Sequence, residues 1–161
     1  MSTTANGIHS RRKDGAVATV EVCSIRLGGG LYGLPISHIL EIVGDTKPET
    51  VPLAPSFVGG LVHYRGEVLT TVCARQLLGM PQLEDKAPDL LVVESANGCF
   101  GLIVDSVREV LTVSQEDFEP NPSTITERSK GFFAGTYKLK DKLMVMLDPA
   151  RIHPVELAKG I

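Results

Sequence analysis

The chain has 161 residues, 43% of them hydrophobic and 22% charged, a composition that suits one globular unit or two small lobes. Its 16 Lys and Arg against 19 Asp and Glu give a formal charge of −3, so it lacks the basic field that holds a nucleic-acid backbone, and we expect no nucleic-acid partner. No apolar run approaches the roughly 20 residues of a membrane-spanning helix, and residues 1–15 lack the apolar stretch of a signal peptide, so we expect a cytoplasmic protein without membrane insertion.

The N-terminal part of the chain predicts a hairpin and a short helix. Residues 1–16 are polar and predict a flexible tail, which leaves 17–161 as the folded domain. The β-branched run from Val17 to Ile25 predicts a strand, and Gly28–Gly30 predicts the turn into a second strand, Leu31–Leu34. Pro35 suits the first turn of a short helix. One face of that helix would carry Ile36, Ile39 and Leu40.

The next segment predicts a second hairpin. Thr50–Pro55 contains two prolines and therefore predicts only an edge strand or a connector. Two apolar strands, Phe57–Val62 and Val68–Val72, flank the turn residues Arg65–Glu67. Arg75–Leu78 predicts a helical turn, because glycine and proline follow it closely.

The C-terminal half predicts mainly strands. Gln82–Asp89 is polar and bracketed by prolines, so it is the expected boundary between two lobes. The apolar segments beyond it predict five strands: Leu90–Glu94, Phe100–Val104, Val107–Val113, Gly131–Leu139 and Leu143–Leu147. Short strands with turns at intervals of about 10 residues favour an all-β barrel or sandwich over a βαβ sheet.

The sequence also contains an internal repeat. Residues 31–43 align with 99–111 at an offset of 68 (101 − 33), and 60–69 align with 135–144 at an offset of 75 (135 − 60). The second copy would then carry an insertion, which falls naturally within 124–130. We interpret the repeat as a duplication that gives two pseudo-symmetric lobes, approximately 17–81 and 88–152, with exchange of segments between them left open. Halves this small hold marginal cores, so the lobes would pack together and leave a groove for partners.

Neither a metal site nor a catalytic group is expected. The cysteines are odd in number, far apart and set among aliphatic residues, which is typical of reduced structural thiols: Cys23, Cys73 and Cys99. The histidines lack the spacing of metal ligands, so we expect no cofactor: they are His9, His38, His63 and His153. Cys73 with His63 as base would make a thiol enzyme, but no third, orienting group lies nearby. Glu41 and Glu109 recur at equivalent repeat positions, for which structural or partner-binding roles are the expectation.

Several motifs in order resemble the family of CheW-like coupling proteins. The stretch Gly60–Gly66 with the following Val68–Arg75 resembles that family's Gly-Val-Ile-Asn-Leu-Arg-Gly and Val-Pro-Val-Val-Asp-Leu-Arg. The segments around Tyr32–Ile42, Val51–Gly60, Phe100–Leu111 and Leu143–Asp148 fit as well, so the likeness covers about 17–152. The chain departs from the family pattern at His63–Tyr64, Thr70–Thr71 and Cys73–Ala74.

The resemblance implies two five-stranded SH3-like β-barrels on a shared aliphatic core, with short helices. It also implies a non-catalytic adaptor that couples chemoreceptors, the methyl-accepting chemotaxis proteins, to a CheA-type histidine kinase in receptor arrays. By motif matching, the receptor tip would contact Ile39, Glu41, Arg65, Val107 and Val110. The kinase's regulatory domain would dock barrel to barrel, at Pro48, Gly60 and Leu90. The departures at His63, Tyr64 and Cys73 leave a β-barrel sensor of small ligands as the alternative.

Overall fold

Strands are the main secondary structure of the described residues. The computed structural model describes residues 18–44, 47–82, 87–121 and 131–159, so the predicted tail 1–16 and the insertion expected within 124–130 lie outside the described residues. The strands are β1 Thr19–Leu27, β2 Gly30–Pro35, β3 Ile39–Gly44, β4 Val58–Tyr64, β5 Glu67–Cys73, β6 Asp89–Ser95, β7 Gly98–Val104, β8 Ser106–Ser114, β9 Phe118–Glu119, β10 Phe133–Lys138 and β11 Leu143–Leu147. The short helices are η1 Ile36–His38, α1 Ala74–Leu77, η2 Gln115–Asp117 and α3 Pro154–Ala158.

The predicted all-β class is confirmed, but the helix expected after Pro35 is wrong. Only Ile36–His38 forms a helical turn, and Ile39 already has extended backbone angles. The reason is long-range pairing, because Ile39 lies opposite Val93 of β6 and starts strand β3. Thr50–Pro55 is a connector without a strand, and the bridge between Glu49 and Leu61 lies just before it. Neither β9 nor α3 was expected from the sequence.

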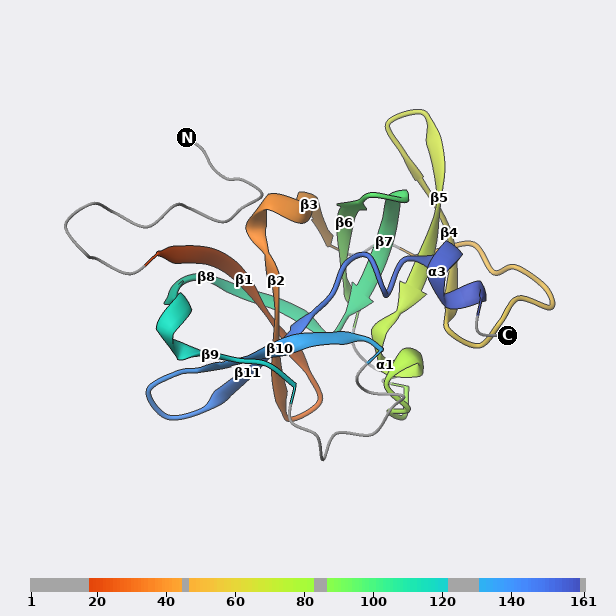
Figure 1. Ribbon diagram of the computed structural model, residues 1–161. Helices are drawn as coiled ribbons and strands as arrows, with labels where there is room; N and C mark the ends of the chain where they lie inside the picture. The colour runs from red at the N-terminus through yellow and green to blue at the C-terminus, as the bar shows by residue number, and fades with distance from the viewer. Residues whose placement is uncertain (1–17, 45–46, 83–86, 122–130, 160–161) are drawn as a thin grey trace.

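Two twisted sheets stand side by side, left and right in Figure 1. The first has the order β8-β1-β2-β11-β10-β9 and the second the order β3-β6-β7-β5-β4. Each sheet therefore combines strands from both halves of the chain, and neither corresponds to 17–81 or 88–152 as a continuous stretch. The chain crosses from the first sheet to the second through η1, and back through the single residue Asp105 between β7 and β8.

The internal repeat appears in the register of the sheets. In the second sheet, parallel strands β5 and β7 place Thr71 opposite Gly101. In the first sheet, parallel strands β11 and β2 place Met146 opposite Gly33. The offset of 75 links Thr71 to Met146, and the offset of 68 links Gly101 to Gly33. Both alignments that the sequence suggested therefore describe the same pseudo-twofold relation.

A pair of backbone hydrogen bonds repeats in the same way. The Cys73 N–H donates to the Phe57 carbonyl at 2.8 Å, and the Asp148 N–H donates to the Phe132 carbonyl at 2.9 Å. Both pairs differ by 75 residues. The equivalence of the two barrels thus extends beyond the strands, into the segments that follow β5 and β11.

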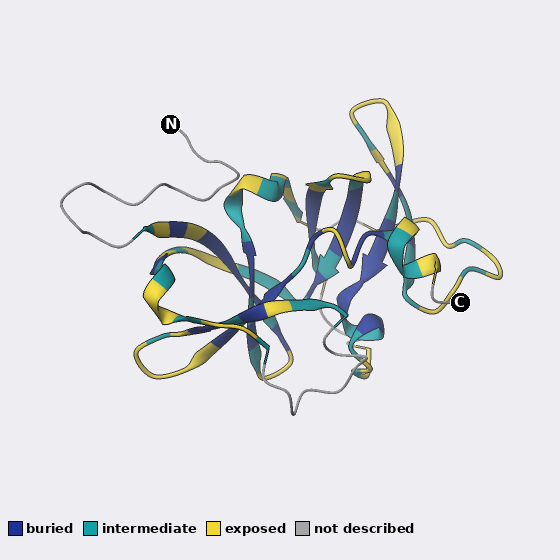
Figure 2. Ribbon diagram, in the orientation of Figure 1, coloured by how far each residue is buried: buried dark blue, intermediate teal, exposed yellow. Residues whose placement is uncertain are grey.

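The core has one part in each barrel and one part between them. The first barrel encloses Val20, Val22, Leu31, Val113, Tyr137, Met144 and Met146. The second encloses Val62, Leu69, Leu90 and Val92. The largest cluster joins both sheets and includes Ile25, Leu27, Leu34, Val72, Leu91, Val93, Phe100 and Leu102. Figure 2 shows these buried segments converging where the sheets meet. Because this shared core is mainly aliphatic, the expected packing of the barrels is confirmed.

Candidate partner-binding surface

Two of the predicted receptor contacts lie at the seam between the barrels. Ile39 on β3 and Val107 on β8 are half-buried, and both pack against the shared core. They are pseudo-equivalent, because Ile39 pairs with Val93 and Val107 pairs with Ile25 at the constant offset of 68. Strands β3 and β8 are each the edge strand of their sheet. The structure therefore brings these two residues to one core from opposite barrels.

The same edge strands expose large aliphatic side chains. Val110 on β8 is 51% exposed, and its equivalent on β3, Ile42, is 48% exposed. Leu40, which sequence reasoning placed on a helix, is 46% exposed on β3. Sequence reasoning missed Leu40 and Ile42 as surface residues, although the alternation of a strand read from Ile39 onward would have found them. We call Ile39, Leu40, Ile42, Val107 and Val110 the seam surface.

Glu41 and Arg65 form an ion pair of 3.3 Å next to these aliphatic residues. Arg65 lies in the β4–β5 turn with a positive φ of 48°, and its guanidinium stands 5.4 Å from the centre of the Tyr64 ring. Burial raises the pKa of Tyr64, and a hydrogen bond to Glu41 raises it further. Because 75% of the Arg65 side chain and 41% of the Glu41 side chain are exposed, this pair contributes little to stability and is available to a partner.

Side chains from other strands hold β8 in place around Val107 and Val110. The Val107 N–H donates to Asp89 Oδ2 at 2.8 Å. The buried Ser24 hydroxyl donates to the Glu109 carbonyl at 2.7 Å and accepts from the Glu109 N–H at 3.0 Å. Ser24 fills the register shift in the pairing of β1 with β8. This part of the seam surface is therefore fixed before any partner arrives.

The predicted kinase contacts divide into two groups. Pro48 and Gly60 lie together, since a Cβ on Gly60 would stand 2.8 Å from Pro48 Cβ and 2.5 Å from the Glu49 carbonyl oxygen. Leu90 is only 4% exposed and packs inside the second barrel, so its side chain is not at the surface. Leu53, in the same connector as Pro48, is fully exposed and was not selected from the sequence.

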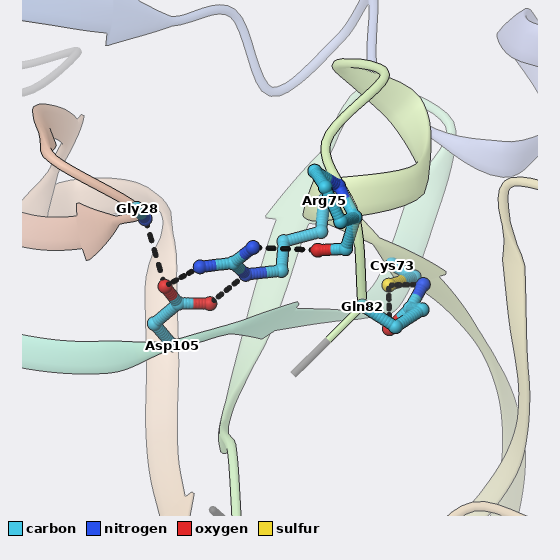
Figure 3. A network of polar contacts seen from close by, with 6 residues as sticks. Gly28, Cys73, Arg75, Gln82 and Asp105 are labelled. Atoms are coloured by element: carbon cyan, nitrogen blue, oxygen red, sulfur yellow. Dashed lines mark hydrogen bonds and ion pairs between the residues drawn. The ribbon is translucent and has the colours of Figure 1, made fainter. Parts of the chain in front are cut away.

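A largely buried polar network surrounds Asp105, the residue through which the chain passes from the second sheet back to the first (Figure 3). Arg75 binds this carboxylate with two hydrogen bonds, Nε to Oδ1 at 2.6 Å and Nη2 to Oδ2 at 2.7 Å. The Gly28 N–H donates to the same Oδ2 at 2.8 Å, and Arg75 Nη1 donates to the Pro81 carbonyl. The hydrogen bonds to Asp105 raise the pKa of Arg75. Since Gly28 lies in the β1–β2 turn of the first sheet and Arg75 lies in α1 just after β5 of the second, this carboxylate links the two barrels.

The thiol-enzyme hypothesis fails on geometry. His63 is exposed and lies opposite Val68, near the β4–β5 turn. Cys73 is buried at the far end of β5. Five residues of strand separate Val68 from Cys73, about 16 Å, so His63 does not act as a base for Cys73. Cys73 instead contacts the Gln82 amide, at 3.4 Å from Nε2.

The alternative of a ligand sensor built on the three departures is also not supported. His63 and Tyr64 lie by the turn, whereas Cys73 lines a separate cavity of about 50 Å³ at the other end of the hairpin. Within the described ranges, no group of three or more His, Cys, Asp or Glu has a metal-binding arrangement. None of the helices in the described part of the chain is long and apolar enough to span a bilayer.

A groove of about 710 Å³ lies between the barrels. It is lined by the equivalent pairs Phe57 and Phe132, and Gln76 and Arg151. None of the five predicted receptor contacts lines it. The predicted receptor contacts therefore stay a prediction about another part of the seam, where Ile39 and Val107 lie on edge strands that pack against the core.

These features define a class of binding scaffold, in which two pseudo-equivalent barrels present fixed apolar edge strands. The CheW-like domain matches residues 21–155, and the chain therefore belongs to the CheW-like family. It is 28% identical to the chemotaxis protein CheW of Rhizobium meliloti over 84% of this chain and 88% of the relative. It is 30% identical to CheW of Helicobacter pylori over 75% of this chain and 73% of the relative.

A solved structure agrees with this assignment. The scaffolding protein TtCheW of Thermoanaerobacter tengcongensis superposes with a TM-score of 0.73 at 28% identity, over 80% of this chain and 88% of the other. The relatives are chemotaxis proteins and the structural neighbour is a scaffolding protein. The predicted CheW-like family is therefore confirmed.

Proposed function

We propose that this protein is a non-catalytic adaptor that couples the cytoplasmic tips of chemoreceptors to a CheA-type histidine kinase. It would work in the cytoplasm, at the inner face of the membrane, within receptor arrays. Family membership and the chemotaxis relatives support this role. The observation that carries it is the seam surface, in which exposed Ile42 and Val110 flank half-buried residues over the shared core.

The seam surface suits the helical tip of a receptor. Exposed aliphatic side chains on a rigid backbone supply affinity at low entropic cost. Glu41 and Arg65, which lie beside them and are both partly exposed, would set the orientation of the helix and the choice of partner. Ile39, Glu41, Arg65, Val107 and Val110 thus remain our proposed receptor contacts, and Leu40 and Ile42 extend them.

The kinase would dock on the second barrel, by contacts between barrels. Pro48 and Gly60 lie together there, and the exposed Leu53 follows in the same connector. Leu90 would contribute to kinase binding only indirectly. Its side chain is buried and supports β6, so it cannot touch a partner. Separate surfaces would let one molecule hold both partners at once.

The proposal is tested by binding of purified components. Val110→Glu places a charge in the seam surface and should weaken binding of a receptor-tip fragment at least tenfold, or about 1.4 kcal/mol, while binding of the kinase regulatory domain stays unchanged. Val155→Glu is the matched control, because Val155 on α3 is 53% exposed against 51% for Val110. Equal receptor affinity for the two variants, measured by calorimetry, would remove the seam surface as the receptor site.

A further inference from the structure

Each barrel has a cavity beside its crossover segment, and the two cavities occupy equivalent places. The cavity in the first barrel measures about 370 Å³ and the one in the second about 50 Å³. Pro88 and Ile103 line the small cavity. At the offset of 68 they correspond to Val20 and Pro35, which line the large cavity. The difference in volume therefore reflects the side chains that each barrel places there.

In the second barrel an arginine fills the space. Arg75 and Asp105 both line the small cavity, and the guanidinium binds both oxygens of the carboxylate (Figure 3). These side chains are only 13% and 11% exposed. A planar cation paired with a carboxylate is thus the native occupant of this place in the fold.

The first barrel lacks both members of that pair. Asp105 corresponds to Ser37 at the offset of 68, and Arg75 corresponds to Ala150 at the offset of 75. Ser37 lines the large cavity. Both replacements are small, so the first barrel has no counterpart of the ion pair, although Ala150 lines the groove between the barrels and Ser37 alone lines this cavity.

A carboxylate is nevertheless present in the large cavity. Asp148 lines it, at the position that Cys73 occupies in the second barrel. Asp148 Oδ1 accepts a hydrogen bond from the Ala150 N–H at 3.1 Å, and Oδ2 lies 3.4 Å from Nε of Arg151, whose side chain is 60% exposed. The ion pair of Asp148 with Arg151 has a longer N–O distance and more exposed side chains than the pair at Asp105. A ligand cation can therefore displace Arg151 at little cost in free energy. Among the described residues, no Lys or Arg lines the cavity itself.

The rest of the lining suits a cation on an apolar stem. Tyr137 and Phe118 line the cavity with rings 5.0 Å apart between centroids and tilted by 56°, and aromatic rings attract cations. Met146 and Leu147 supply apolar walls. His38 Nδ1 meets the Glu94 carbonyl at 2.8 Å. Because a carbonyl only accepts, Nδ1 of His38 carries a hydrogen and donates it.

We propose that this cavity of the first barrel is a binding site for an alkylguanidinium group, with Asp148 as its counter-ion and the Tyr137 and Phe118 rings against its stem. The ligand would take the place that Arg75 fills in the other barrel. The site does not depend on the coupling role, since it shares no residue with the seam surface.

The test is a titration of the full chain followed by amide chemical shifts. N-acetyl-arginine amide should give saturable shifts confined to the cavity, for example at Gln115, Ala134 and Leu147. N-acetyl-citrulline amide has the same shape without the charge and should bind at least tenfold more weakly. Agmatine is the second cation probe: tighter binding of the arginine amide assigns the site to an arginine side chain of a partner, and tighter binding of agmatine assigns it to a free small molecule.

Two variants localise the effect. Asp148→Asn should weaken N-acetyl-arginine amide about tenfold, whereas Asp141→Asn, in the exposed β10–β11 turn, should leave its affinity unchanged. Ser37→Asp restores the carboxylate of the other barrel and should strengthen binding. Equal affinity for the arginine and citrulline compounds, shifts that map outside the cavity, or indifference to both Asp148→Asn and Ser37→Asp would overturn the proposal.

Discussion

The carboxylate of Glu41 lies 3.3 Å from the guanidinium of Arg65, although β3 and β4 are the two opposite edge strands of their sheet. The pair therefore joins β3 to the β4–β5 turn and marks where the five-stranded sheet curls into a barrel. Its side chains are too exposed for a large share of the stability. Its position beside the aliphatic edge of β3 instead suits the recognition of a partner.

Arg65→Glu should weaken receptor binding five- to tenfold, because it places two carboxylates together where a partner meets an ion pair. The melting temperature should change by less than about 3 °C, as expected for a surface substitution. Lys138→Glu is a matched control in the other barrel, since Lys138 is 53% exposed and pairs with Glu119 at 3.5 Å. If both variants lose receptor affinity equally, net charge and not the Glu41–Arg65 pair explains the loss.

Gly60→Ala should destabilise the fold by about 1–3 kcal/mol, or more where the backbone cannot yield. Gly60 has a φ of +121°, and an added Cβ would lie 2.5 Å from the Glu49 carbonyl oxygen. Gly66→Ala separates conformational strain from crowding, because Gly66 also has a positive φ but no neighbour within 4 Å. Urea denaturation should show the larger loss for Gly60→Ala, and a larger loss for Gly66→Ala would contradict the close approach of β4 to the connector.

Phe100→Ala should cost about 3–5 kcal/mol, the usual penalty for emptying a buried aromatic site. Phe100 is fully buried in the core that both sheets share, with its ring 5.1 Å from that of His153. Because the core is shared, both barrels should lose stability in one transition. Leu143→Ala, at a residue 61% exposed, should change stability by less than about 0.5 kcal/mol. Separate melting of the two barrels in Phe100→Ala would argue against a single core.

Stability should fall as the pH drops below the ordinary pKa of histidine, about 6.5, in part because of His153. Burial lowers the pKa of His153, and its Nδ1 accepts the Val155 N–H at 3.0 Å, which requires the unprotonated nitrogen. The unfolded chain therefore binds this proton more readily than the native state. The contribution of neutral His153 to stability is complete above the pKa that this histidine has in the unfolded chain. It is lost as the pH falls toward the lower pKa of His153 in the folded protein.

His153→Asn keeps an acceptor at the start of α3 and should reduce the slope of unfolding free energy between pH 7 and 5. An unchanged slope in His153→Asn, followed by urea denaturation at each pH, would mean that carboxylates alone set the acid sensitivity.

Local sequence patterns predicted most strands and turns. Pairing between distant strands decided whether ambiguous segments form a helix or a strand and which of their faces are buried. The alternation of Val17–Ile25 and the glycines at 28–30 specify β1 and its hairpin without help from elsewhere. Ile39 and Leu40 suit a helix or a strand equally, and only the pairing of β3 with β6 resolves them. Likewise the run Leu90–Val93 gave no sign of which face is covered, and in the fold all four residues are buried.

The candidate site followed from the sequence only in part. Motif matching selected Ile39 and Val107, which the fold brings to one core from opposite barrels. The large cavity of the first barrel was beyond prediction, because it depends on the absence at Ser37 of the carboxylate that Asp105 carries at the equivalent position. Such an absence becomes visible only when the registers of both sheets fix which residues correspond.

The most direct test of the coupling role is the formation of a ternary complex by the unmodified protein. The receptor-tip fragment, the kinase regulatory domain and this chain are mixed and followed by analytical ultracentrifugation. We expect one species that contains all three, with the receptor released by Val110→Glu and the kinase retained. Binding to neither partner, or displacement of one partner by the other, would contradict an adaptor with two separate docking surfaces.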